Sequence, residues 1–173
     1  EFLTLSKTVK NLPDESSVYT ANYLQGYNYL KQRKFTGALG YFQDAVAGIK
    51  RNSMFIRNNY VKEDILGDAT LRAGDCFFKR NKYRDAVRFY NDAINNGYEG
   101  FEYAIFQKAI IEGLRGRTTE KILALENLID NHPNSEYADD ALFQLGITFQ
   151  EIGQLNKAID PLRKLVANYR GST

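Results

Sequence analysis

The sequence predicts an all-α protein built from about four antiparallel helix pairs, preceded by part of an earlier helix. Three observations lead to this prediction. A pattern of small, aromatic and alanine residues recurs at constant spacing along the chain. Within each copy, large apolar residues stand three or four positions apart, which is the period of a helix. The composition is that of a folded protein, with 43% hydrophobic and 25% charged residues among 173.

The repeated pattern is clearest in three copies, which agree in every spacing. The first copy has Gly26, Tyr29, Phe35, Ala38, Phe42 and Ala45. The second copy has Gly74, Phe77, Tyr83, Ala86, Tyr90 and Ala93. The third has Gly146, Phe149, Gly153, Leu155, Ala158, Leu162 and Leu165. A weaker copy lies between the last two, with Ala109, Gly116, Leu125, Leu128 and Pro133 at the matching positions and Lys121 in place of an alanine.

The register of these copies divides the chain into repeats. They begin near Tyr19, Gly67, Glu102 and Asp139, so the steps are 48, 35 and 37 residues. We assign repeat one to 19–66, repeat two to 67–101, a degenerate repeat three to 102–138 and repeat four to 139–173. The first step is too long, and its surplus lies at about 50–63. Either the second helix of repeat one is extended, or a loop with Met54, Phe55 and Ile56 is inserted.

The first residues of the chain suggest one more helix. Pro13 stands six residues before Tyr19, as Pro133 stands six before Asp139. If Pro13 closes a repeat, then residues 1–14 hold the last helix of a preceding repeat, and the chain is a piece of a longer protein. Pro161 is a local conflict, because proline removes a helix donor and clashes with the preceding turn. We expect a kink or a delayed helix start there.

Packing of two antiparallel helices explains the small residues. Where the helices cross, the backbones approach so closely that only Gly or Ala fits, and Gly26, Gly74, Ala109 and Gly146 take this role. Large side chains then fill the groove made with the next helix. The expected core is Tyr29, Phe42, Phe77, Tyr90, Phe149 and Leu162.

Little in the sequence points to catalysis or to a cofactor. One His, one Cys and no Trp leave few groups for metal binding or general-base chemistry. His132 at a helix end is expected to face solvent or the helix dipole, and Cys76 is expected to be a buried hydrophobe. Asp139 and Asp140 fit the start of a helix. The segment 113–117 resembles a helix turn more than a phosphate loop, although Arg115 and Arg117 could meet an anion there. We therefore expect no enzyme, no metal and no cofactor.

Charge and hydropathy exclude two further classes of partner. Lys and Arg number 23 against 21 Asp and Glu, so the formal charge is +2 and there is no strong field to attract nucleic acid. The apolar runs are far shorter than the roughly 20 residues that a membrane-spanning helix needs. We expect neither nucleic-acid binding nor a membrane span.

The spacing of the small, aromatic, Ala and Pro positions resembles that of the tetratricopeptide repeat. This resemblance covers nearly the whole chain and implies a right-handed α-α superhelix, in which the first helix of each pair lines the concave face. It also implies that ligands contact the second, fifth, ninth, twelfth and thirteenth positions of a repeat.

Carried onto this sequence, those positions form a mainly apolar and aromatic strip. The expected partner-binding residues are Tyr23, Tyr27, Lys31, Leu71, Asp75, Phe78, Lys79, Phe106, Ile110 and Phe143, and the same rule also reaches Tyr103, Ile147 and Gln150. Tyr23 and Tyr27 are the strongest candidates, because Tyr offers a large contact area with a polar tip. For Phe78 and Phe143, packing against a neighbouring repeat is an equal alternative. The strip lacks the Lys, Asn and Arg set with which some relatives clamp a C-terminal carboxylate.

The segment 131–146 is most similar to the bacterial cell-envelope subgroup of this family, which includes outer-membrane assembly lipoproteins and Tol-Pal-associated proteins. We therefore expect a non-catalytic scaffold that binds a partner peptide or helix in its concave groove, in the bacterial periplasm or cell envelope, with the cytoplasm as the alternative location. Two other functions stay open at this point. The chain could be a structural spacer or self-association module, or an accessory domain of an enzyme encoded elsewhere in the parent protein.

Overall fold

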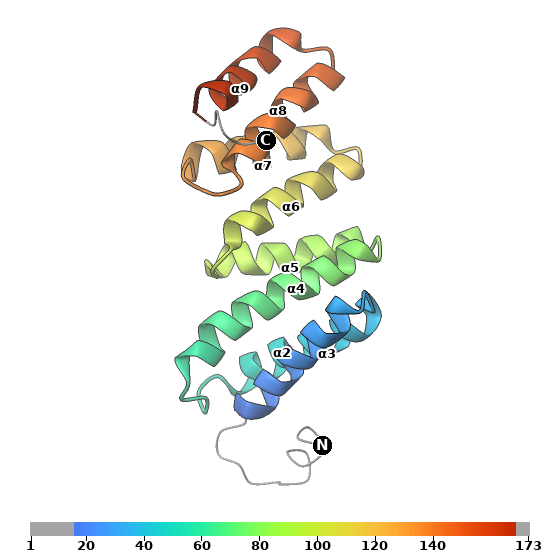
Figure 1. Ribbon diagram of the computed structural model, residues 1–173, viewed down its shortest axis with the longest axis vertical. Coiled ribbons are helices and arrows are strands. Elements are labelled where there is room, and N and C mark those ends of the chain that lie inside the picture. The colour runs from blue at the N-terminus through green and yellow to red at the C-terminus, as the bar shows by residue number, and fades with distance from the viewer. Residues whose placement is uncertain (1–15, 169–173) are drawn as a thin grey trace. The chain divides into compact units, whose positions relative to one another are not determined.

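The computed structural model describes residues 16–168, and every regular element in this part of the chain is a helix (Figure 1). The elements are α2 (Ser16–Lys31), α3 (Phe35–Asn52), the π-helix η1 (Val61–Ile65), α4 (Leu66–Lys79), α5 (Tyr83–Asn96), α6 (Phe101–Leu114), α7 (Thr118–Asn131), α8 (Ala138–Glu151) and α9 (Leu155–Asn168). The partial helix expected at 1–14 lies outside the described residues. None of the helices within 16–168 is long and apolar enough to cross a membrane.

The chain divides into two compact units, Glu1–Phe101 and Glu102–Thr173. In unit 1, helices that follow one another in sequence pack together: α2 on α3, α3 on α4 and α4 on α5. In unit 2, α8 packs on both α7 and α9. Each unit thus buries its apolar residues between helices that are neighbours in the sequence.

The turns between paired helices share one backbone geometry. Each contains a residue with positive φ, and these residues are Arg33 (57°), Asn81 (58°), Gly116 (73°) and Gly153 (75°). In each turn the next amide donates a hydrogen bond to the carbonyl five residues earlier, as from Lys34 N to Tyr29 O (3.0 Å) and from Gln154 N to Phe149 O (2.8 Å). This bond satisfies a carbonyl that the helix end would leave unpaired. The turns keep the same spacing as the sequence repeats.

The glycines at the helix crossings are required for packing, as the sequence predicted. A Cβ atom on Gly26 would lie 2.7 Å from the ring of Phe42, and one on Gly74 would lie 2.7 Å from the ring of Tyr90. On Gly146 it would lie 2.5 Å from Leu162. The close neighbour is in each case the side chain 16 positions later, on the second helix of the pair. The small residue therefore makes room for a large side chain, and not only for a second backbone.

The expected core is largely correct. Phe42 and Tyr90 are fully buried, and Phe77 and Phe149 are buried to nearly the same degree. Tyr29 and Leu162 are only half-buried. Tyr29 lies beside Tyr41 near the end of α2, with ring centroids 5.3 Å apart.

Both explanations for the surplus residues of repeat one apply. Helix α3 has 18 residues, whereas α5 has 14. A loop over residues 53–58 then leads to a helical segment that begins at residue 59 and runs through η1 directly into α4. Ile56 is 3% exposed and anchors this loop, while Met54 is 81% exposed and Phe55 is 59% exposed.

Pro161 does not delay the start of its helix, contrary to one of the two expectations. Helix α9 begins at Leu155 and continues through Pro161 to Asn168. The amides of Lys157 and Ala158 both donate to Gln154 O, so the first turn is closed before the proline. The Pro161 ring is buried, and burial of apolar area is favourable where proline lacks a hydrogen-bond donor.

Candidate functional site

The residues that the sequence singled out most strongly lie on two first helices of unit 1. Tyr23 and Tyr27 are four positions apart on α2, and therefore point from the same side of this helix. Their rings meet edge to face, with centroids 5.1 Å apart. Both also contact the buried Phe42 ring on α3, at centroid distances of 6.3 Å and 5.4 Å. This packing fixes the orientation of both phenols.

The two phenols are joined to α4 through one carboxylate. The hydroxyl of Tyr23 donates to Asp68 Oδ2 at 3.0 Å, and the hydroxyl of Tyr27 donates a short hydrogen bond to the same oxygen. Asp68 begins a chain of polar contacts along α4. Arg72 Nε donates to Asp68 Oδ1 at 3.1 Å and its Nη1 donates to Asp75 Oδ2 at 2.5 Å.

Asp75 is the last residue of α4 in this series of polar contacts, and it links α4 to α5, the second helix of the same pair. Its Oδ1 accepts a hydrogen bond of 2.7 Å from the hydroxyl of the buried Tyr90 on α5. We call the six residues of this chain the tyrosine-carboxylate network; they are Tyr23, Tyr27, Asp68, Arg72, Asp75 and Tyr90. The network connects α2, α4 and α5, so its side chains are held before any partner arrives.

The electrostatics of the network favour neutral phenols and a charged guanidinium. Burial, with the charge of Asp68 next, raises the pKa of the Tyr23 phenol. Burial and the hydrogen bond to Asp68 raise the pKa of Tyr27 to about 12. For Arg72, burial alone would lower the pKa, but the charges of Asp75 and Asp68 outweigh it and the pKa is raised. Near neutral pH the phenols therefore stay protonated and act as hydrogen-bond donors to Asp68.

The other expected residues of unit 1 do not join this network. Lys31 and Lys79 are exposed at the ends of α2 and α4. Phe78 is half-buried and lies against Tyr83 across the turn, with centroids 6.0 Å apart. Leu71 is only 3% exposed, so its side chain packs inside unit 1 and offers almost no surface to a partner.

The expected residues of unit 2 lie on α6 and α8. Phe106 stacks on Tyr137 at a centroid distance of 5.9 Å, and Tyr103 contacts the same ring at 5.5 Å. Ile110 on α6 and Ile147 on α8 are half-buried. On α8, Phe143 is 47% exposed and Gln150 is exposed.

Sequence reasoning missed three of the residues that organise these surfaces. Asp68 is the second residue of repeat two. The second position of a repeat is one of the ligand-contacting positions that the family resemblance implies, and Tyr103 was selected for the same reason. Arg72 stands four residues after Asp68 and three before Asp75, which is the spacing of ion pairs on one helix face. Tyr137 carried no such signal, because its contacts come from a helix more than 30 positions earlier.

The other ionisable side chains that the sequence drew attention to are buried, or are paired with neighbouring groups of the protein. Glu112 is nearly buried, and both arginines that could have met an anion face it instead: Arg115 Nη1 at 3.1 Å and Arg117 Nη1 at 3.7 Å. Burial, together with the charge of Asp75, raises the pKa of Cys76 to about 12. Asp139 Oδ1 accepts a hydrogen bond of 2.8 Å from the Asp140 amide. Within residues 16–168, no three or more His, Cys, Asp or Glu side chains are grouped to hold a metal ion.

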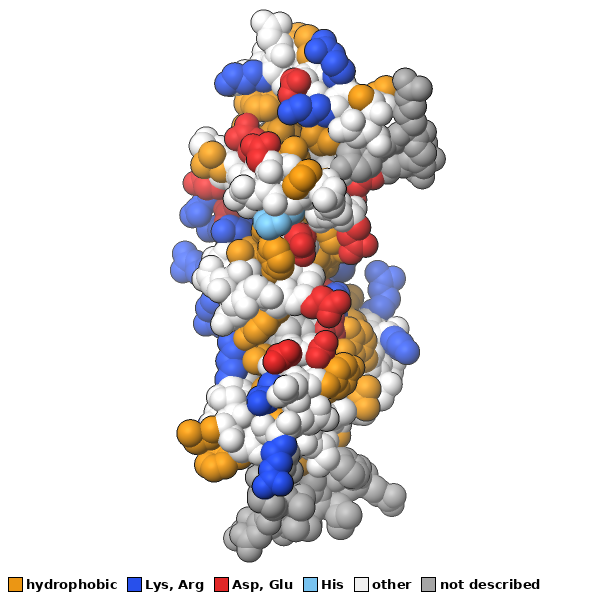
Figure 2. Space-filling model, turned by 90° about the vertical axis from the view of Figure 1, so that its left-hand side faces the viewer, with side chains coloured by type: hydrophobic (Ala, Val, Ile, Leu, Met, Phe, Trp, Pro, Cys, Tyr) orange, Lys and Arg blue, Asp and Glu red, His pale blue; other side chains and the backbone are white. Residues whose placement is uncertain are grey.

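The surface of the described residues is mixed in character. On the face shown in Figure 2, hydrophobic, basic and acidic side chains are interspersed within each unit. Such interspersion differs from the contiguous basic stripe typical of nucleic-acid-binding domains.

Comparison with solved structures places the fold. A tetratricopeptide repeat protein from Parabacteroides merdae is 14% identical and has a TM-score of 0.71, over 90% of this chain and 55% of that protein. The chain therefore spans about half the length of that relative. BtubC from P. vanneervenii is 12% identical with a TM-score of 0.74, over 99% of this chain and 71% of its own. These similarities confirm the all-α solenoid class expected from the sequence.

A third solved structure is that of YrrB, described as a TPR protein with an unusual peptide-binding site. It is 21% identical and has a TM-score of 0.65, over 91% of this chain and 72% of its own. No relative is found among curated proteins. A sequence profile described as tetratricopeptide repeat matches residues 68–98, 103–135 and 140–172. Because these three stretches make up more than half of the chain, the protein belongs to the tetratricopeptide repeat family.

Proposed function

We propose that this protein is a non-catalytic scaffold which binds a partner peptide or helix on the face that α2 and α4 form in unit 1. The tyrosine-carboxylate network carries this proposal. Two aromatic rings and the charged groups of α4 are fixed on adjacent first helices, and they remain part-buried instead of enclosed in the core. The membership of the tetratricopeptide repeat family supports a role in protein interaction.

The geometry also indicates which groups a partner would use. The hydroxyls of Tyr23 and Tyr27 donate their hydrogen bonds to Asp68, so the phenolic oxygens are left as acceptors and the ring faces as apolar area. A partner backbone N–H could donate to these oxygens while an apolar side chain covers a ring. Since the rings are already locked on Phe42, binding them loses little side-chain entropy.

The network changes the choice of test variant. Truncating Tyr23 and Tyr27 to alanine would remove the packing on Phe42 as well as the partner contacts, so a loss of binding would be ambiguous. Tyr23→Phe with Tyr27→Phe keeps the rings and removes only the hydroxyls. Tyr60→Phe is the matched control, because Tyr60 lies in the same unit, is 58% exposed and stands outside the network.

The binding test uses peptides selected from a random displayed library on the intact chain, with affinities measured by fluorescence polarisation. We expect the double Phe variant to weaken binding about 30-fold, since two hydrogen bonds contribute about 1 kcal/mol each. Circular dichroism should stay helical, and Tyr60→Phe should bind as the parent does. If the double variant and a second variant, Lys31→Glu, both keep full affinity for every selected peptide, the α2/α4 face is not the binding surface.

We further propose the bacterial cell envelope as the location of the protein, with the cytoplasm as the alternative. The similarity of the segment 131–146 to envelope members of the family supports this proposal. Fractionation of source cells, followed by detection with an antibody raised against this chain, tests it. Recovery with cytoplasmic markers would contradict it.

A further inference from the structure

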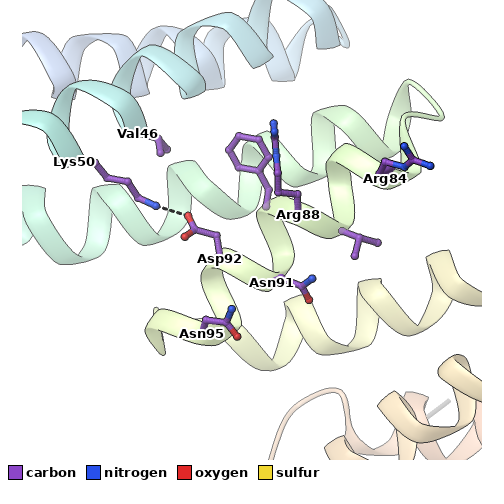
Figure 3. A pocket seen from close by; sticks show the side chains of 9 residues that line it. Val46, Lys50, Arg84, Arg88, Asn91, Asp92 and Asn95 are labelled. Carbon is purple, nitrogen blue, oxygen red and sulfur yellow. Dashed lines mark hydrogen bonds and ion pairs between the residues drawn. The ribbon is translucent and has the colours of Figure 1, made fainter.

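A second candidate surface lies in unit 1, between the second helices α3 and α5 and away from the tyrosine-carboxylate network. It is an open groove of about 630 Å³ (Figure 3). Val46, Val87 and Phe89 give it apolar walls, and Lys50, Arg84 and Arg88 supply cations. Figure 3 shows Lys50 reaching from α3 toward Asp92 on α5. The groove thus combines apolar area with positive charge.

The cations of this groove are only partly neutralised by the protein. Lys50 Nζ lies 2.5 Å from Asp92 Oδ2. Arg88 is 70% exposed and its contact with Asp85 is loose, at 3.8 Å. The side chain of Arg84 makes no ion pair or hydrogen bond with any residue in the described part of the chain. Asp92 is the single carboxylate among the lining residues, so positive charge is in excess.

Arg88 is also held in place by the groove wall. Its guanidinium carbon lies 5.5 Å from the centroid of the Phe89 ring, which is a cation-π geometry. Phe89 in turn packs on Phe77, with centroids 5.4 Å apart. A planar guanidinium fixed beside an apolar wall suits bidentate recognition of a carboxylate.

The equivalent groove of unit 2 has the opposite charge balance. It lies between the second helices α7 and α9, with residues of α8 forming part of its lining, and has a volume of about 320 Å³. It carries Lys157 and Lys164 against the three carboxylates of Glu126, Asp130 and Asp160. Lys164 pairs with Asp160 at 3.0 Å. The same fold therefore produces grooves of either sign, and the positive charge of the α3/α5 groove comes from its particular residues.

We propose that the α3/α5 groove docks an acidic segment of a partner protein, as a site separate from the α2/α4 face. Apolar side chains of this segment would lie on Val87 and Phe89, and its Asp or Glu side chains would pair with Arg84 and Arg88. Such charge-assisted hydrogen bonds to Arg are shorter and stronger than neutral ones. Because the groove is open to solvent, the interaction weakens as salt screens the charges.

The experiment selects peptides from a random displayed library on the intact chain and measures their affinities by fluorescence polarisation. Arg84→Gln with Arg88→Gln removes both charges and keeps side-chain length. Lys157→Gln with Lys164→Gln is the control, since it removes two cations from the equivalent groove of unit 2. We expect a class of selected peptides rich in Asp and Glu beside Leu or Phe, whose affinity falls about tenfold or more in the arginine variant and is unchanged in the control.

Several outcomes would overturn the proposal. One is that no acidic peptides are recovered; another is that both variants affect them equally. A third is light scattering that shows a dimer lost on Arg84→Gln/Arg88→Gln, because the groove would then be occupied by a second copy of the chain. Tyr23→Phe with Tyr27→Phe separates the two sites: it should weaken peptides of the α2/α4 face and leave the acidic class unaffected.

Discussion

At the scale of single residues, the turns of unit 1 carry a backbone cost that the turns of unit 2 avoid. Arg33 and Asn81 adopt positive φ, where a Cβ atom crowds the following carbonyl, whereas unit 2 has Gly116 and Gly153 at the same place. The left-handed conformation costs an ordinary residue about 1–2 kcal/mol. Asn tolerates it better, because its short side chain bonds locally. Arg33 therefore occupies the less favourable of the two turns.

We predict that Arg33→Gly raises the free energy of unfolding by up to about 1 kcal/mol, since the relief of crowding exceeds the entropy that glycine loses on folding. Asn81→Gly should have a smaller effect. Gly116→Ala should lower the free energy by about 1 kcal/mol, because it puts a Cβ atom where the turn needs none. Urea unfolding followed by circular dichroism measures all three. A loss of stability in Arg33→Gly would contradict this interpretation of the turn.

The phenol of Tyr27 makes stability depend on pH. Its pKa is about 12 in the folded protein against an ordinary value of 10.0, so the folded state holds the proton more tightly. The resulting stabilisation is complete below about pH 10 and is lost as the pH rises from about 10 to about 12. We predict that Tyr27→Phe is less stable than the parent at neutral pH but loses stability less steeply over this range.

Urea unfolding at several pH values tests the prediction for Tyr27. Both proteins should carry Cys76→Ala, because burial also raises the pKa of that thiol to about 12 and it titrates in the same range. Both should also carry Tyr23→Phe, because Tyr27 contributes to the raised pKa of Tyr23 and removing Tyr27 would change that titration as well. The remaining tyrosines are common to both proteins and cancel in the comparison. Parallel pH profiles for the parent and Tyr27→Phe would show that the phenol is not held in its neutral form.

At the scale of helix pairs, the unit of packing is a small residue opposite a large one, 16 positions apart. Gly26 and Phe42 form such a pair, while repeat three has Ala109 and Leu125, both fully buried, at the same spacing. We predict that Gly26→Ala alone costs about 1–3 kcal/mol, since its Cβ atom would overlap the Phe42 ring. Combined with Phe42→Leu, it should cost at least about 1 kcal/mol less than the sum of the two single changes.

A double-mutant cycle measured by urea unfolding tests this pairing. Gly40→Ala is the control, because Gly40 lies inside α3 with nothing within 4 Å of an added Cβ atom. There alanine should stabilise the protein by about 0.5–1 kcal/mol through its higher helix propensity. If the effects of Gly26→Ala and Phe42→Leu on the free energy of unfolding were additive, the residues at positions 26 and 42 would not be coupled through their packing.

How far the sequence predicts each element depends on the range of the contacts that form it. The crossings and the turns follow from spacings of a few to 16 residues, and the repeat pattern states these directly. The repeat pattern does not predict the π-helix η1, whose contacts reach α2 and α3 as well as the adjoining α4. Ile56 is buried and Phe55 exposed in the same loop, a difference that periodicity in a short segment cannot predict.

At the scale of the whole molecule, the same reasoning applies to the candidate site. Tyr23 and Tyr27 were identified from their positions in a repeat, but their shared partner Asp68 is more than 40 residues away and belongs to the next repeat. The ligand-contacting positions of a repeat identify one face of a helix, but they do not show which residues on that face are buried. Leu71 was selected by such a rule and lies inside unit 1.

The order of contacts predicts how a local defect spreads. In unit 1 the helices pack in sequence order, and in unit 2 the packing of α8 on α9 involves the close approach of Gly146 and Leu162. Repeat arrays with nearest-neighbour contacts open in parts, because each helix pair is stabilised mainly by adjacent helices. Gly146→Ala should therefore accelerate amide hydrogen exchange in α8 and α9 while the amides of α2 and α3 keep their rates. Hydrogen exchange measured by mass spectrometry follows both regions at once, and Gly26→Ala should give the reverse result. Equal acceleration along residues 16–168 would instead show that the chain opens as one cooperative unit.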